Sequence, residues 1–181
     1  DMLGLKGIPS FDLAAACSGF LYCLETARAY VSLYPDAKIL IVGSEVTTSR
    51  INFEDRTTCV LFGDGAGAVV LEASDKPGIL ATALHADGSH NPILSVPGQI
   101  NRGEVVGDPF LRMDGQAVFK FAVKVLVDVA REVMAEAGVG IGDVDWLIPH
   151  QANIRIIQAT GKRLGVPVEK VIATVGQHGN T

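Results

Sequence analysis

Cys17 is the side chain in this sequence best suited to nucleophilic chemistry. It lies at the junction between residues 10–16, a short run expected to form a buried strand, and residues 18–33, whose spacing predicts a helix. Unpaired backbone N–H groups and the helix dipole favour a negative charge at such a junction, so we expect an accessible thiolate with a lowered pKa. A thiolate is the species that attacks a thioester. On spacing alone, the alternative is a small buried apolar side chain.

His150 and Asn180 are the next candidates. The segment DWLIP at residues 145–149 predicts a short strand, and His150 follows at its carboxyl end, where α/β sheets usually build their sites. A lone histidine is more often structural, and three others compete for the role, His85, His90 and His178. Asn180 follows a glycine, and this dipeptide by itself indicates a turn.

Alternating strands and helices must position these side chains. Besides residues 10–16, the predicted strands cover residues 38–43, 66–72, 79–86, 145–149 and 171–175. The predicted helices cover residues 18–33, 116–137 and 153–164; the second carries an apolar stripe and stops at Gly138. Residues 87–108, rich in Gly, Pro and Asn, are expected to form a loop. This order predicts an α/β layered fold with a parallel or mixed sheet.

The composition is that of a folded domain, with 181 residues of which 48% are hydrophobic and 19% charged. No apolar run approaches the roughly 20 residues that cross a bilayer. The net charge of −5 argues against general nucleic-acid binding, which needs a basic face. Cys17, Cys23 and Cys59 lack paired C-x-x-C spacing, so neither a disulfide framework nor a metal site is expected.

A glycine-rich stretch, GDGAGA at residues 63–68, does not match a phosphate-binding loop. No Gly-Lys-Ser/Thr follows it, and the glycines precede a strand instead of opening a helix. We expect these glycines to permit a tight turn and close backbone packing near the site.

Four blocks occur together in one order: DLAAACSGF at residues 12–20, GDGAGA at 63–68, PHQAN at 149–153 and HGNT at 178–181. Each block alone is a weak signal, but their joint occurrence is specific. The set resembles the β-ketoacyl-acyl-carrier-protein synthase III family of the thiolase superfamily, over essentially the whole chain. The resemblance implies a thiolase-like layered αβαβα fold.

The same resemblance implies roles for the three candidates. Cys17 would be acylated by an acyl-CoA, commonly acetyl-CoA in the family, while His150 and Asn180 would bind the thioester carbonyl of malonyl-acyl-carrier protein. Loss of CO2 leaves an enolate oxygen, which an imidazole N–H and a carboxamide N–H stabilise. The carbanion then attacks acyl-Cys17, which would make the protein the initiating condensing enzyme of type II fatty-acid biosynthesis. No cofactor is expected, and the starter acyl group is left open.

The resemblance also assigns residues to substrate binding. The tunnel for the CoA or phosphopantetheine arm would be formed by Arg56, Phe62, Gly115, Phe119, Asn153 and Arg155. The acidic carrier protein would dock on a basic patch of Lys120, Arg155, Lys162 and Arg163. On spacing alone, Phe62 and Phe119 fit core positions equally well, and Gly115 fits a turn equally well. The basic side chains fit surface positions, and those on helices fit a solvated helix face.

The resemblance places the chain in the middle of a longer subunit. Residues 1–75 would end an N-terminal thiolase-like half, and residues 78–181 would form most of a C-terminal half. The whole enzyme is expected to be a cytoplasmic homodimer. Three alternatives remain open: a specialised-metabolite or polyketide paralogue, a non-catalytic member of the same fold, and a cysteine hydrolase that uses Cys17 and His150 without decarboxylating malonyl groups.

Overall fold

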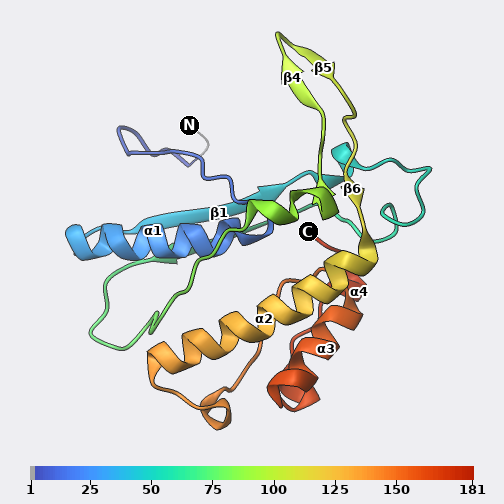
Figure 1. The fold of residues 1–181 in the computed structure, drawn as a ribbon. Helices are drawn as coiled ribbons and strands as arrows, with labels where there is room; N and C mark the ends of the chain where they lie inside the picture. The colour runs from blue at the N-terminus through green and yellow to red at the C-terminus, as the bar shows by residue number, and fades with distance from the viewer. Residues whose placement is uncertain (1–2) are drawn as a thin grey trace.

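The nucleophile candidate is carried by a helix that packs on a two-stranded sheet (Figure 1). The computed structural model describes residues 3–181. A single 3-10 turn (Ala16–Ser18) leads into α1 (Gly19–Leu33), which packs on β1 (Ile39–Glu45) and β2 (Gly65–Leu71). The predicted helix and both predicted strands are confirmed. The two strands run antiparallel, with Glu45 opposite Gly65, so of the two expected arrangements, parallel or mixed, this pair excludes the purely parallel one.

A β-hairpin projects from the molecule at β4 (Gln99–Asn101) and β5 (Glu104–Val106) (Figure 1). Its base is a second antiparallel pair, β3 (Leu94–Ser95) with β6 (Arg112–Met113), preceded by a 3-10 helix (Gly88–Ile93). Residues 87–108, which were expected to form a loop, therefore also contain a 3-10 helix and three short strands. Arg102 and Gly103 have φ of 52° and 87°, and two successive positive φ values produce the tight turn that matches strand twist in hairpins.

The best-packed part of the molecule lies between α2 (Gly115–Ala137) and α3 (Ile154–Leu164). Val127, Leu164 and Val166 form its buried cluster. The Asp114 carboxylate accepts hydrogen bonds from the first backbone N–H groups of α2, and both helices end at a left-handed glycine, as the sequence predicts for α2 at Gly138. The remaining turns are short: Thr47–Arg50, Ile141–Asp143, Val168–Lys170 and α4 (Val175–His178).

Four predicted strands are not regular strands in the described part of the chain. Residues 10–16 and 79–86 run without ladder partners, and a strand exists only where a neighbour satisfies its N–H and C=O groups. Residues 145–149 and 171–175 meet in one parallel bridge, Leu147 with Val171. The second segment cannot extend the ladder because its chain turns at Thr174 into α4.

Candidate active site

A wide cavity of about 3140 Å³ lies between α1, β1 and α2, and Cys17, His150 and Asn180 all line it. The three residues come from segments far apart in the sequence: the turn before α1, the segment before α3 and the end of α4. The structure therefore brings all three sequence candidates to one place.

Cys17 lies in the turn that precedes α1, as the junction predicted. The residue before it, Ala16, has a φ of 45°, a left-handed conformation that costs a residue with a Cβ about 1–2 kcal/mol. Cys17 is exposed to the cavity, yet surrounding protein atoms desolvate its sulfur and raise the pKa of the thiol, while a hydrogen bond with its own backbone N–H acts in the opposite direction. The expectation of a lowered pKa is wrong here, because desolvation of the sulfur outweighs this hydrogen bond.

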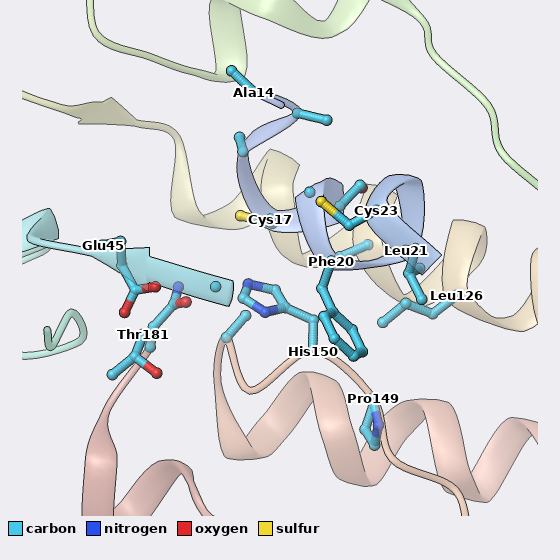
Figure 2. A pocket seen from close by; sticks show the side chains of 18 of the residues that line it. Ala14, Cys17, Phe20, Leu21, Cys23, Glu45, Leu126, Pro149, His150 and Thr181 are labelled. Carbon is cyan, nitrogen blue, oxygen red and sulfur yellow. The ribbon is translucent and has the colours of Figure 1, made fainter. Parts of the chain in front are cut away.

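His150 faces Cys17 across the cavity. Figure 2 shows the imidazole and the sulfur pointing into the same space from different elements. Burial lowers the pKa of His150 below its ordinary value of 6.5, so the ring is neutral at pH 7. A neutral imidazole has one nitrogen that accepts a proton and one that donates a hydrogen bond. Both capacities are useful beside a protonated thiol.

Asn180 is fixed through its backbone. It forms a parallel bridge with Phe62, donating its N–H to the Leu61 carbonyl at 2.8 Å and accepting from the Gly63 N–H at 2.9 Å. A Cβ at Gly63 would lie 2.4 Å from the His178 carbonyl oxygen, so only glycine fits this crossing. The predicted close packing at the glycine-rich stretch is confirmed at this position.

The expected tunnel residues divide into two groups. Five of them line the cavity with the three candidates: Phe62, Gly115, Phe119, Asn153 and Arg155. The Arg155 guanidinium lies 5.7 Å from the centroid of the Phe119 ring, within the range of a cation–π contact. Asn153 also has a structural task, since its side chain accepts the Arg155 N–H and caps α3. Arg56 is exposed and outside the described lining of this cavity.

The expected docking patch is spread along α3 and α2. Lys120 and Arg155 lie at the cavity. Lys162 and Arg163 are exposed in the last turn of α3, about 10 Å along the helix from Arg155 at 1.5 Å per residue. Together these four residues place positive charge on the cavity rim and on the helix beside it.

Two residues of interest were missed at the sequence level. Gln151, inside the PHQAN block, uses its side chain to hold the segment of His150 against the segment that leads to Asn180. Glu45 ends β1 next to the cavity, with Oε1 buried and without a hydrogen-bond partner among the described residues. Figure 2 shows Glu45 and Thr181 at the same side of the site. The block itself was a signal for Gln151; nothing in the sequence distinguished Glu45.

Among residues 3–181, no group of three or more His, Cys, Asp or Glu side chains is arranged to hold a metal ion. In the same range, no helix has both the length and the apolar character required to cross a membrane.

Comparison with family models and solved structures gives one consistent result. Residues 11–88 match the model of 3-oxoacyl-[acyl-carrier-protein (ACP)] synthase III, and residues 134–181 match the model of its C-terminal part. The solved 3-oxoacyl-[acyl-carrier-protein] synthase III of Aquifex aeolicus VF5 is 42% identical, with a TM-score of 0.90 over 99% of this chain and 56% of that one.

Two further solved structures are similar. The synthase III of Pseudomonas aeruginosa PAO1 is 39% identical, with a TM-score of 0.91 over 99% of this chain and 56% of that one. A priming β-ketosynthase from the R1128 polyketide biosynthetic pathway is 37% identical, with a TM-score of 0.87 over 99% of this chain and 55% of that one. The present chain thus spans little more than half the length of these relatives. The expected thiolase-like α/β fold is confirmed, and the chain belongs to the 3-oxoacyl-[acyl-carrier-protein] synthase III family.

Proposed function

We propose that the protein is the initiating condensing enzyme of type II fatty-acid biosynthesis, using an acyl-CoA, with acetyl-CoA as the first choice, and malonyl-acyl-carrier protein. The observation that carries this proposal is the convergence of a thiol, a neutral imidazole and a carboxamide on one cavity of a family member. The products are a 3-oxoacyl-acyl-carrier protein, CoA and CO2.

The first half-reaction is acyl transfer to Cys17. Because desolvation raises the pKa of the thiol, it needs a base, and the neutral ring of His150, which points into the same space, is the candidate for accepting its proton. The sulfur attacks the thioester carbonyl, the bond to the CoA sulfur breaks, and CoA leaves with that proton. The backbone N–H of Cys17, at the start of the helix, would donate to the oxyanion of this step.

The second half-reaction makes the carbon–carbon bond. CO2 leaves the malonyl group, and the electron pair of the broken bond forms an enolate whose oxygen accepts hydrogen bonds from His150 and Asn180. The carbanion attacks acyl-Cys17, the C–S bond breaks, and the thiolate takes up a proton. Bonds and electrons balance without an oxidant or reductant, so we propose that no cofactor takes part.

The other expectations about the whole protein belong to the same proposal. We propose that the complete subunit works in the cytoplasm as a homodimer. We further propose that Lys120, Arg155, Lys162 and Arg163 guide the acidic carrier protein to the cavity, with the CoA or phosphopantetheine arm lying against Phe119.

A second candidate function is the priming of a polyketide. It is favoured by the 37% identity to the priming β-ketosynthase of the R1128 pathway. The two proposals share the chemistry at Cys17 and differ in the acyl group and in the carrier protein that is accepted.

The experiment that tests the function is intact-mass analysis of the full-length protein and of Cys17→Ser after incubation with a panel of acyl-CoAs. An acyl adduct on the wild type that is missing from the variant identifies the nucleophile, and the best adduct identifies the primer. Absence of an adduct with every acyl-CoA would overturn the proposal. Decarboxylation of a malonyl thioester by the same protein distinguishes it from a cysteine hydrolase.

A further inference from the structure

The side chain of Gln151 forms four hydrogen bonds across two segments of the chain. Its Nε2 donates to the Pro149 carbonyl at 2.8 Å and to the Ile172 carbonyl at 3.2 Å. Its Oε1 accepts from the N–H of Thr174 at 2.7 Å and of Val175 at 3.1 Å. A carboxamide has two N–H donors and two acceptor lone pairs, so all of its capacity is used. Such a complete set of hydrogen bonds indicates that the side chain fixes the position of the two segments relative to each other.

The two segments joined by Gln151 carry the two groups proposed to stabilise the enolate. His150 is its immediate neighbour on one side. On the other side, Thr174 is the N-cap of α4 and Val175 is its first residue; the helix ends at His178, two residues before Asn180. By accepting hydrogen bonds from the N–H groups of Thr174 and Val175, Oε1 caps the start of this short helix. The N-cap residue itself provides no side-chain cap.

In the described chain, backbone hydrogen bonds join the two segments only ahead of Gln151. The ladder between the segments consists of the Leu147–Val171 bridge, with the Leu147 N–H bonded to the Lys170 carbonyl and the Ile172 N–H bonded to the Leu147 carbonyl, both at 2.9 Å. Beyond Ile172, the contacts of Gln151 replace the ladder that a regular strand would provide.

We propose that Gln151 is the positioning residue that sets the separation of the His150 imidazole and the Asn180 carboxamide. This inference rests on the proposed function and adds a residue to its second half-reaction. Decarboxylation depends on both donors reaching one oxygen, whereas acylation of Cys17 does not use Asn180. Loss of the Gln151 hydrogen bonds therefore slows decarboxylation more than acylation.

Two substitutions separate positioning from general stability. Gln151→Leu keeps the approximate volume and removes all four hydrogen bonds. Gln151→Glu keeps the acceptor oxygens toward Thr174 and Val175 but turns a carboxylate toward the carbonyls of Pro149 and Ile172. Protonation of this carboxyl at lower pH restores one donor. The matched control is Gln177→Leu, an exposed glutamine on α4 itself.

The experiment uses the full-length protein and measures three quantities for each variant: the rate of Cys17 acylation by acetyl-CoA, the rate of CO2 release from malonyl-acyl-carrier protein, and the thermal unfolding temperature. We expect Gln151→Leu to slow CO2 release by about tenfold to a hundredfold, the cost of displacing a group by about 1 Å, and to slow acylation, which uses His150 but not Asn180, by a smaller factor. For Gln151→Glu, the ratio of its CO2 release to that of the wild type rises as the pH falls. Gln177→Leu behaves as the wild type.

Each outcome decides the inference. CO2 release unchanged in a folded Gln151→Leu protein, or equal losses in both half-reactions, overturns the positioning role while leaving the proposed function intact. A wild-type protein that releases no CO2 overturns the proposed function and, with it, this inference. If Gln151→Leu does not fold, Gln151→Glu provides the same comparison, and a ratio independent of pH contradicts the proposal.

Discussion

Phe62 and Asn180 lie opposite each other in a parallel bridge, which fixes the backbone of Asn180 by hydrogen bonds of 2.8 and 2.9 Å. The bridge connects the chain just before β2 with the segment that follows α4. Gly179, with a φ of 72°, and Gly63 make the approach possible, since a side chain at either position would meet backbone atoms of the other segment. The placement of a proposed catalytic side chain thus depends on two positions that carry no side chain.

The first prediction concerns Gly63. In Gly63→Ala the new Cβ lies 2.4 Å from the His178 carbonyl oxygen, so one of the two segments must move. We expect the unfolding free energy to fall by about 1–3 kcal/mol, as for other overpacked sites. Because the displaced segment carries Asn180, we also expect malonyl decarboxylation to slow more than Cys17 acylation.

Denaturant unfolding and the two half-reaction assays provide the measurement. The matched control is Gly67→Ala, since a Cβ at Gly67 meets nothing within 4 Å and its φ is not in the left-handed range. Equal effects of the two substitutions would show that the crossing at Gly63 does not restrict the chain.

The second prediction concerns the thiol of Cys17. Since desolvation raises its pKa, the free thiol is almost entirely protonated at pH 7. Alkylation of Cys17 by iodoacetamide should therefore accelerate about tenfold per pH unit and show no plateau until the pH exceeds about 8.5, the ordinary value for cysteine. Peptide mass spectrometry separates this site from Cys23 and Cys59. A plateau already reached near neutral pH would mean that the thiolate is stabilised in the full-length protein.

The third prediction concerns His150, whose pKa is lowered by burial. The folded protein disfavours the charged ring, so the stability associated with the neutral ring is fully present above pH 6.5 and is lost as the pH falls through the lower folded pKa. We expect a histidine NMR resonance that titrates below pH 6.5 and disappears in His150→Gln.

The same substitution tests the link between stability and pH. Between pH 6.5 and the folded pKa, the unfolding temperature of the wild type should decrease relative to that of His150→Gln, which has no ring to protonate. Parallel pH profiles for the two proteins would contradict the assignment of a buried neutral imidazole.

The fourth prediction concerns carrier-protein docking. Charge reversal of the exposed pair, Lys162→Glu with Arg163→Glu, should raise the KM for malonyl-acyl-carrier protein by about tenfold at low salt, because electrostatic steering is lost. Acylation by a small acyl-CoA should not change. The control is the double reversal Lys6→Glu with Lys76→Glu, two exposed lysines outside the described lining of the cavity. If this control has the same effect, net charge rather than the position of the patch controls docking.

The sequence predicted well those elements whose pattern is local. The apolar stripe of α2 and its stop at Gly138 depend only on neighbouring residues, and the same holds for α3, which the sequence predicts over residues 153–164. The predictions of strands over residues 10–16 and 145–149 were wrong for the opposite reason. A strand needs hydrogen bonds to a partner distant in the sequence, and periodicity does not reveal that partner. The hairpin at β4 and β5 was overlooked because its signal is a two-residue turn, Arg102 and Gly103.

The sequence predicted which side chains belong to the candidate site, but not the contacts that hold them in place. Cys17, His150 and Asn180 were identified from their blocks, and the structure brings them to one cavity. The direction of the Cys17 pKa was not predictable, since it depends on atoms that surround the sulfur in three dimensions. The four hydrogen bonds of Gln151 connect residues 149–151 with residues 172–175, and no spacing rule relates those positions.

The crossing of residues 61–63 with residues 178–180 has a consequence for how such chains diversify. Cys17 lies in the sequence before the first of these two stretches, and the pair proposed to stabilise the enolate lies in segments far along the chain. A hybrid of two relatives keeps a functional arrangement only where both parents leave room at the crossing, as Gly63 and Gly179 do here. This one backbone contact therefore restricts which halves can be combined.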